Sequence, residues 1–246
     1  MAPFNSYRLI HLIMKPLYIF RHINCEGPGY LSEVLAREKL PFRLIAIDQD
    51  EVLPRNIENC SGLVFMGGPM SVNDSLPWIE EELTLIRMAQ AEGMPILGHC
   101  LGGQLISKAL GGEISANPVT EIGWHPVRSS DNPAAQDWLG GLQETTLFHW
   151  HGETFSIPEG AEVILENDNC SHQAFAIGNT LALQCHVEMT APMVSEWSTL
   201  YKDELVNPSP SIQSAQQMTE GLEQRITEAQ QAADILYQRW LQPLLG

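Results

Sequence analysis

Basic residues are scarce in this 246-residue chain, which has 13 Lys+Arg against 30 Asp+Glu and a formal net charge of −17. A chain this acidic lacks the positive patch that nucleic acid or an anionic membrane surface would need, so we expect neither as a partner. No apolar run approaches the roughly 20 residues that span a bilayer. Because 44% of the residues are hydrophobic, the chain can bury a full core, which excludes an intrinsically disordered class.

Cysteine is also sparse, and its pattern excludes a disulfide framework. The five residues are scattered, odd in number and without a Cys-x-x-Cys pair: Cys25, Cys60, Cys100, Cys170 and Cys185. This pattern indicates a reducing compartment and one or more special thiols. The apolar run 9–13 is too short for a signal-peptide core and no small-residue cleavage site follows it, so we expect residues 1–13 to form a flexible arm of a cytoplasmic protein. No P-loop or Gly-x-Gly-x-x-Gly segment is found, and we expect no cofactor.

Short apolar runs alternate with helical patterns, which predicts βαβ units around a parallel sheet and an α/β fold. The expected strands are 17–20, 42–47, 62–66, 95–98, 163–165, 174–177 and 181–186. The expected helices are 30–39, 78–91 and 101–110.

The character of the chain changes after Thr190. A helical pattern over 192–206 is followed by the breaker Asn207-Pro208-Ser209-Pro210, and apolar residues then recur every three or four positions from Ile212 to Trp240. This spacing predicts one long amphipathic helix, whose apolar stripe either packs on its own domain or forms a dimer seam. We therefore divide the chain into an arm (1–13), a main domain (14–190) and a C-terminal helical extension (191–246) that packs on it.

The segment that says most about chemistry is Pro95-Ile96-Leu97-Gly98-His99-Cys100-Leu101-Gly102-Gly103-Gln104. An apolar strand runs into Gly-x-Cys-x-Gly and a helix follows at once, which is the pattern of a nucleophile elbow with cysteine in place of serine. The positive end of the helix dipole would favour the Cys100 thiolate, and the Leu101 N–H would face the attacked carbonyl. A buried structural cysteine beside an ordinary glycine turn is the alternative for this segment taken alone.

A thiol nucleophile needs a base, and the base needs an acceptor that orients it. His186 and Glu188 follow the apolar run 181–185, and residues two apart on a strand point the same way. Upstream, the strand before Gly67-Gly68-Pro69 frees the Gly68 N–H, which together with the Leu101 N–H could form an oxyanion hole. Taken alone, Gly-Gly-Pro indicates only a turn.

These three segments, in this order, resemble the signatures of class I glutamine amidotransferases. The resemblance covers residues 16 to about 190 and is strongest to the stand-alone branch similar to the glutaminase domain of GMP synthase; Pro77-Trp78, Gly123-Trp124 and 148–155 also look like this branch. It implies a flavodoxin-like three-layer αβα sandwich with a mostly parallel sheet. It further implies Cys100 as nucleophile, His186 as base and acid, Glu188 as its orienting group, and Gly68 and Leu101 as the oxyanion hole.

The resemblance also implies that Gln104 and the His151-Gly152-Glu153 loop hold the amino-acid end of the substrate. The chain departs from the family pattern twice: Val187 stands where proline is usual between His and Glu, and Glu153 stands where aspartate usually follows His-Gly. The catalytic side chains are kept, so we expect activity to survive, whereas the extra methylene of Glu153 could displace the substrate's α-amino group.

Two neighbouring segments have alternative interpretations. His149 and His151 lie two apart on an expected strand, but two ligands without a partner pair do not make a metal site, and we expect no metal. The segment 21–26 follows the first strand, where α/β sheets bind ligands, and it either lines the pocket or forms a plain loop.

The sequence therefore predicts a Cys-His-Glu enzyme that cleaves glutamine through a γ-glutamyl thioester and releases ammonia and glutamate. A separate ammonia-accepting subunit or a homodimer could complete it. The alternatives are a γ-glutamyl peptidase or hydrolase without ammonia transfer, and a non-catalytic binding or redox-sensing module on the same fold.

Overall fold

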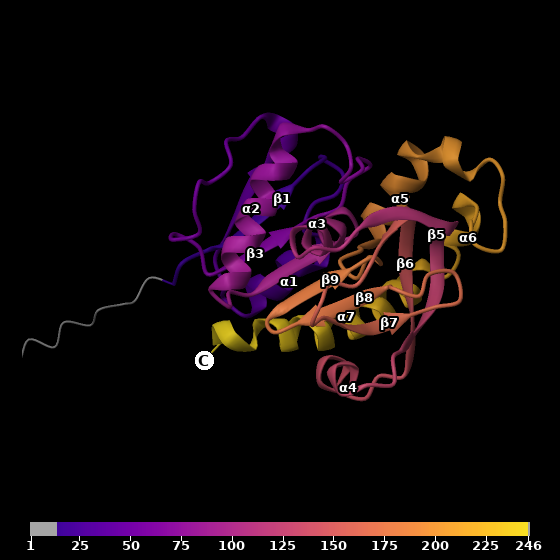
Figure 1. Ribbon diagram of the computed structural model, residues 1–246. Coiled ribbons are helices and arrows are strands. Elements are labelled where there is room, and N and C mark those ends of the chain that lie inside the picture. The colour runs from indigo at the N-terminus through magenta and orange to yellow at the C-terminus, as the bar shows by residue number, and fades with distance from the viewer. Residues whose placement is uncertain (1–13, 246) are drawn as a thin grey trace, which may run out of the picture.

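The computed structural model describes residues 14–245, so the arm expected at 1–13 lies outside the described residues. Within that range, one sheet has the strand order β2-β1-β3-β4-β9-β8-β7-β5-β6 (Figure 1). The strands are β1 (Leu17–Arg21), β2 (Phe42–Ala46), β3 (Gly62–Phe65), β4 (Ile96–His99), β5 (Ile114–Ser129), β6 (Glu144–Phe155), β7 (Glu162–Glu166), β8 (Ala174–Ile177) and β9 (Thr180–Leu183).

Helices cover the sheet on both faces. They are α1 (Gly29–Arg37), α2 (Pro77–Ala91), α3 (Leu101–Ala109), α4 (Pro133–Leu139), α5 (Ala191–Leu200), α6 (Ala215–Thr219) and α7 (Leu222–Leu245), with 3₁₀ turns η1 (Ile47–Gln49) and η2 (Lys202–Leu205). Among residues 14–245, no helix combines the length and the apolar character that crossing a membrane would require.

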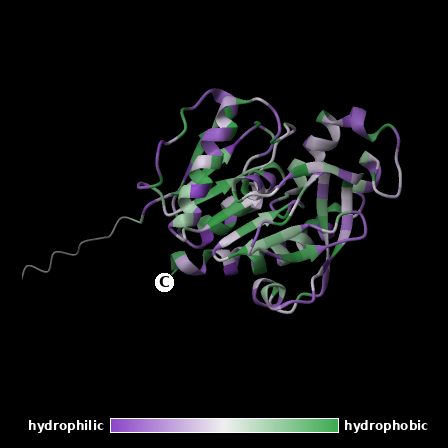
Figure 2. Cartoon of the chain, viewed as in Figure 1, coloured by the Kyte–Doolittle hydropathy of each residue, from purple (hydrophilic) through white to green (hydrophobic). Residues whose placement is uncertain are grey.

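The first half of the sheet is parallel and agrees with the expected strands. β2, β1, β3, β4 and β9 pair in parallel in that order. β3, β4 and β9 are buried along their whole length, because helices lie on both sides of them. This explains why their sequences are mostly apolar and do not alternate with polar residues (Figure 2).

The second half of the sheet is antiparallel and carries β5, which the sequence pattern did not predict, and β6, which was expected only around His149 and His151. β5 and β6 form a long hairpin that pairs residues 114–128 with 144–155, with a register shift between Ala116 and Glu121. Pro118 and Pro126 interrupt the β5 sequence, which explains why its pattern did not indicate a strand. β9 is shorter than expected and ends at Leu183, whereas His186 makes an isolated bridge with Phe148 of β6.

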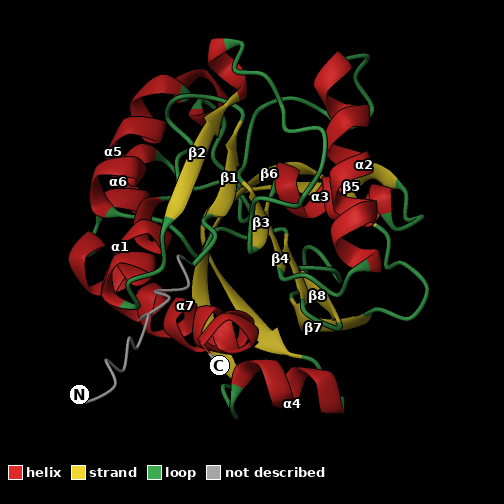
Figure 3. Cartoon of the chain, turned by 90° about the vertical axis from the view of Figure 1, so that its left-hand side faces the viewer, coloured by secondary structure: helices red, strands yellow, loops and turns green. Residues whose placement is uncertain are grey.

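Two apolar cores lie on opposite faces of the sheet and make the three-layer sandwich that the family resemblance implied. One core includes residues of α2 and α3, and the other includes residues of α1, α4 and α7. Figure 3 shows α2 and α3 on one side of the strands and α1 and α7 on the other.

The expected single helix from Ile212 to Trp240 is wrong in its first third. Ile212 is extended and bridges to Ile122 of β5, and the chain then turns at Gly221, whose φ of 63° lies in the left-handed region that favours glycine. The stripe is divided between the short helix α6, which buries Met218, and α7, and the buried side chains of both belong to the core on the sheet face shared with α1. The stripe therefore packs on its own chain. The helix expected over 192–206 is α5 followed by η2.

Candidate active site

Cys100 stands on a sharp turn between β4 and α3. Its φ of 48° and ψ of −106° are unusual for a residue with a side chain, and such strain concentrates at functional sites. The turn is possible because Gly98 and Gly102 meet backbone to backbone, where a Cβ on either residue would overlap main-chain atoms. The Cys100 thiol lies at the N-terminus of α3, as the elbow pattern predicts, and donates a long hydrogen bond of 3.8 Å to the Trp150 carbonyl.

His186 and Glu188 form a short buried pair beside this thiol. The imidazole Nδ1 donates to Glu188 Oε1 at 2.7 Å, and both side chains are at most 2% exposed. Burial opposes protonation of His186, but Glu188 and the nearby Cys100 thiol outweigh it and raise the pKa of the imidazole. Nε2 has no hydrogen-bond partner among the described residues, so it remains available for proton transfer.

Glu188 is ionised and lies close to a second histidine, His99. Burial alone would raise the pKa of its carboxyl, but His99, His186 and the hydrogen bond from His186 lower it to about 2. His99 Nε2 lies 3.8 Å from Glu188 Oε2 and shares a 2.9 Å hydrogen bond with the Tyr237 hydroxyl. Because Tyr237 belongs to α7, the C-terminal helix reaches the back of this pair, a link that sequence analysis missed.

A cavity of about 380 Å³ opens over the thiol, and all but two of the predicted site residues line it. Cys100 and His186 are in its wall together with Gly68, Gln104, His151, Gly152 and Glu153. The exceptions are Glu188, which lies behind His186, and Leu101, which is buried as the first residue of α3. The cavity lies at the carboxyl ends of β1, β3, β4 and β9, where parallel sheets bind ligands.

Residues 151–153, expected as a loop, belong to β6 and are held by hydrogen bonds from two neighbouring segments. Glu153 Oε1 accepts from the Ser71 hydroxyl at 3.1 Å, and its carbonyl accepts from Gln104 at 3.4 Å. The same carbonyl lies 3.0 Å from His151 Nδ1. The residues expected to hold the amino-acid end of a substrate are therefore brought together and hydrogen-bonded to one another.

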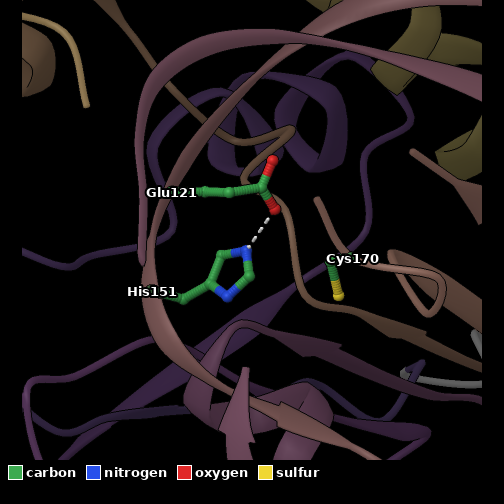
Figure 4. Close-up of side chains that lie close together, drawn as sticks. All are labelled: Glu121, His151 and Cys170. Carbon is green, nitrogen blue, oxygen red and sulfur yellow. Dashed lines mark hydrogen bonds and ion pairs between the residues drawn. The ribbon is translucent and has the colours of Figure 1, made fainter. Parts of the chain in front are cut away.

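Glu121, His151 and Cys170 lie close together beside this part of β6, and their ligand atoms fall within 4.8 Å of one another (Figure 4). The Glu121 carboxylate is already saturated, because His151 lies 3.0 Å from Oε2 and three side-chain amides donate to its oxygens, those of Asn167, Asn169 and Gln173. Burial raises the pKa of the Cys170 thiol and favours its neutral form, which is a poor metal ligand. These three side chains therefore suit a hydrogen-bonded support for this part of β6 better than a metal centre.

His149, the other histidine weighed as a ligand, is fully buried and has no hydrogen-bond partner among the described residues. Burial lowers its pKa to about 3, so the ring is neutral. Its Nδ1 lies 4.0 Å from Glu121 Oε2, beyond bonding distance.

One wall of the cavity was missed by sequence analysis, although segment 21–26 had been weighed as a pocket lining. Glu26 follows β1, and Trp197, Tyr201 and Glu204 come from α5 and η2, more than 170 residues later. Burial raises the pKa of Glu26 to about 7. The only signal for this wall was the unexplained Glu26 after a strand, because aromatic residues on a surface helix carry no sequence signature of a site.

Comparison with known proteins shows which family this chain resembles. The family model for "Glutamine amidotransferase class-I" matches residues 31–195. The glutamine amidotransferase-like protein YfeJ of Salmonella typhimurium is 31% identical over 151 residues, which are 58% of this chain and 63% of YfeJ. A glutamine-hydrolysing GMP synthase of Caldicellulosiruptor saccharolyticus is 33% identical over 130 residues, 51% of this chain and 24% of that protein. The chain thus matches less than two thirds of the length of these curated relatives.

Solved structures extend the similarity to nearly the whole chain. A glutamine amidotransferase of Methylobacillus flagellatus superposes with a TM-score of 0.90 at 43% identity, covering 93% of this chain and 94% of its own. A glutamine amidotransferase of Thermotoga maritima superposes with a TM-score of 0.81 at 26% identity, covering 92% and 98%. The family model spans well over half of the chain, and this protein belongs to the class I glutamine amidotransferases, enzymes that act on the side-chain amide of glutamine.

Proposed function

We propose that this protein hydrolyses the side-chain amide of glutamine with Cys100, His186 and Glu188 as its catalytic triad. The observation that carries the proposal is the free Nε2 of His186, which lies beside the Cys100 thiol while Nδ1 is held by Glu188 at 2.7 Å. This is the arrangement in which one ring nitrogen is oriented and the other can move a proton. Family membership supports glutamine as the substrate class.

In the first half of the proposed reaction, the thiol proton passes to His186 Nε2 and the sulfur attacks the side-chain carbonyl carbon. The N–H groups of Gly68 and Leu101 donate hydrogen bonds to the oxygen on which negative charge develops, and Leu101 is placed for this as the first residue of α3. The tetrahedral intermediate collapses as the C–N bond breaks. The departing nitrogen takes the proton from His186 and leaves as ammonia, and a γ-glutamyl thioester remains on Cys100.

In the second half, His186 removes a proton from water, which attacks the thioester. The C–S bond breaks, the sulfur regains its proton through His186, and glutamate is released. Glu188 remains ionised throughout, because its pKa of about 2 lies far below neutral pH, and it stabilises the imidazolium form of His186.

Of the two departures from the family pattern, Val187 and Glu153, only Glu153 lines the cavity. Val187 is fully buried and lies between two side chains that keep their contact, so proline is not required there. Glu153 does line the cavity, and its carboxylate is drawn to Ser71 at 3.1 Å. We therefore expect the chemistry to be kept and the fit of the substrate's α-amino group to be altered.

The experiment that tests this function is intact mass spectrometry of the purified chain mixed with glutamine and quenched in acid, alongside an assay for free glutamate. We expect a γ-glutamyl adduct on Cys100 and steady glutamate release, both absent from a Cys100→Ala variant. Cys60→Ala is the matched control, since this thiol is buried far along the chain from the elbow. No adduct and no glutamate from the unmodified chain would contradict the proposal and favour a binding or redox-sensing module.

Where the ammonia goes is a separate question. The relatives named GMP synthase are glutamine-hydrolysing enzymes of which this chain matches about a quarter. We infer that this chain either passes ammonia to a separate subunit or releases it. Turnover by the chain alone that rises severalfold when a partner is added would support the first, and full turnover without a partner would support the second.

A further inference from the structure

The wall of the cavity beside His186 is built from aromatic rings and carboxylates, and the proposed reaction does not use it. Trp197 stands edge-on to the His186 ring with centroids 4.9 Å apart. Tyr201 packs against Trp150 at 5.4 Å, and its hydroxyl donates to Glu26 Oε1 at 3.4 Å. These side chains come from four separate segments of the chain, so the tertiary structure alone assembles them.

Carboxylates lie at the inner and outer ends of this wall. Glu26 is 6% exposed and shares the space above Gly67 with the His186 ring, where any Cβ would collide with the Glu26 carboxylate. Glu204 is exposed at the rim, and its Oε2 accepts from the Trp150 indole N–H at 3.1 Å. Among the described residues that line the cavity, none is lysine or arginine.

The position of His186 assigns this wall to one part of the substrate. Since His186 gives its proton to the departing nitrogen, that nitrogen must lie on the His186 side of the scissile bond. The glutamyl part of the substrate then lies towards Gln104 and residues 151–153 of β6, which line the same cavity. Ammonia is far too small to fill a wall of three aromatic rings.

We propose that Glu26, Trp150, Trp197, Tyr201 and Glu204 form a leaving-group subsite for γ-glutamyl amides whose departing amine carries a second, positively charged nitrogen. Aromatic faces and carboxylates attract organic cations, and no basic side chain in the subsite opposes them. The subsite rests on the proposed hydrolase function and widens its substrate class. The chemistry is balanced as before: the C–N bond breaks, the diamine takes the proton from His186, and water later cleaves the thioester.

The inner carboxylate is suited to this role in a further way. Burial raises the pKa of Glu26 to about 7, so without ligand the cavity is spared a full buried charge near neutral pH. A cation beside the carboxyl would favour its ionised form. The facing groups that influence it are His22, His186, Glu188 and the Tyr201 hydroxyl.

The test uses three amides whose departing amines share a four-carbon chain and differ in the charge at its end. They are γ-glutamyl-1,4-diaminobutane (cationic), γ-glutamyl-butylamine (neutral) and γ-glutamyl-4-aminobutyrate (anionic), assayed beside glutamine with the full chain. We expect kcat/KM to fall in that order, with the cationic amide about tenfold or more above the neutral one, as a desolvated cation–π and carboxylate contact supplies.

Variants locate the preference. We expect Glu204→Gln and Glu26→Gln each to lower the cationic-to-neutral ratio severalfold, while Asp203→Asn, an exposed neighbour outside the cavity, leaves the ratio unchanged. A wild-type ratio near one with glutamine turnover intact would overturn the subsite alone. Absence of turnover on all three amides and on glutamine would overturn the hydrolase proposal and the subsite with it.

Discussion

The Glu188–His186 pair and the Glu121–His151 pair are built from the same two residue types, are equally buried and both place their histidine in the cavity wall. Their distances are similar, 2.7 Å and 3.0 Å, and in both pairs the pKa of the carboxyl is about 2. They differ in whether the other ring nitrogen and the carboxylate oxygens have further hydrogen-bond partners among the described residues. His186 Nε2 is unpartnered, whereas both ring nitrogens of His151 and both oxygens of Glu121 are engaged.

This difference separates a pair that can carry chemistry from a pair that holds structure. A ring nitrogen can move a proton only if no permanent partner occupies it. A carboxylate that accepts four N–H donors instead ties its own strand, here β5, to the segments that supply the donors, β6 and the loop at 167–173. Mutations should therefore affect turnover at the first pair and stability at the second.

The largest effect is expected from His186→Ala. Removal of the imidazole beside the thiol should abolish both proposed proton transfers, and we expect kcat to fall by about a thousandfold or more. Steady-state glutamate release measures it, with urea unfolding to show that the variant is folded. His149→Ala is a matched control, because His149 is equally buried but lacks any partner in the described chain. A loss of only a few-fold would remove His186 from the mechanism.

Glu121→Gln should act on stability. The new amide group would face N–H donors that now meet a carboxylate oxygen, and we expect the free energy of unfolding to fall by about 2–3 kcal/mol. Urea unfolding at pH 7 measures this loss. Glu166→Gln, which breaks an exposed 3.1 Å ion pair with Arg128, should cost at most about 1 kcal/mol. Equal losses for the two variants would contradict a supporting role for Glu121.

The same substitution carries a pH signature. Burial would raise the pKa of Glu121, but its hydrogen bonds with His151 and Asn167 and the proximity of the His149 and His151 rings lower it from 4.5 to about 2. Its stabilisation is therefore fully present above pH 4.5 and is lost as the pH falls towards 2. Glu121→Gln should flatten this part of the stability profile, and an unchanged acid slope would argue against an ionised Glu121.

Glu188→Gln should lower turnover more moderately. Glutamine can still hold the His186 ring but no longer supplies a charge to stabilise its imidazolium form, and we expect kcat to fall at least tenfold, about 1.4 kcal/mol. The pKa of His186 should fall as well, which an NMR titration of the ring would show, since Glu188 is the main group that raises it. An unchanged rate together with an unchanged pKa would leave Glu188 no part in the reaction.

Tyr237→Phe should have the smallest effect. The hydroxyl contacts His99, which in turn lies 3.8 Å from Glu188, so its loss reaches the triad only through two intervening groups. We expect a two- to fivefold loss in kcat with KM unchanged, about 1 kcal/mol or less. A loss as large as that of Glu188→Gln would show that α7 orients the triad directly.

Several features were predictable because they depend on neighbours in the sequence. The strands over 17–20, 62–66 and 95–98 were evident as apolar runs, and the elbow at Cys100 was evident because its glycines are adjacent to the thiol. The His186–Glu188 contact was expected from a strand, but β9 ends at Leu183 and the contact is made by irregular chain bridged to β6. The two side chains do contact each other at 2.7 Å, but the strand expected to carry them ends before His186.

Other features could not be predicted because their partners lie far apart in the chain. β5 reads as a polar, proline-interrupted segment and becomes a strand only when β6 pairs with it. The long helix expected from Ile212 begins only at Leu222. Ile212 instead pairs with β5, and Gly221 turns the chain before α7. Local patterns carry no information on such pairings, whose cost in chain entropy is offset only by contacts formed on folding.

The sequence by itself determined the candidates for nucleophile, base and orienting acid, because Cys100, His186 and Glu188 each belong to a short segment with recognisable residue types and spacing. Only the tertiary structure decided what surrounds them. The packing of α5, η2 and α7 in the folded chain brings Trp197, Tyr201 and Tyr237 to the site. It also leaves Glu26 buried beside His186. Burial and long-range contact set the charge of a carboxyl and the shape of a cavity, and neither is a property of a segment alone.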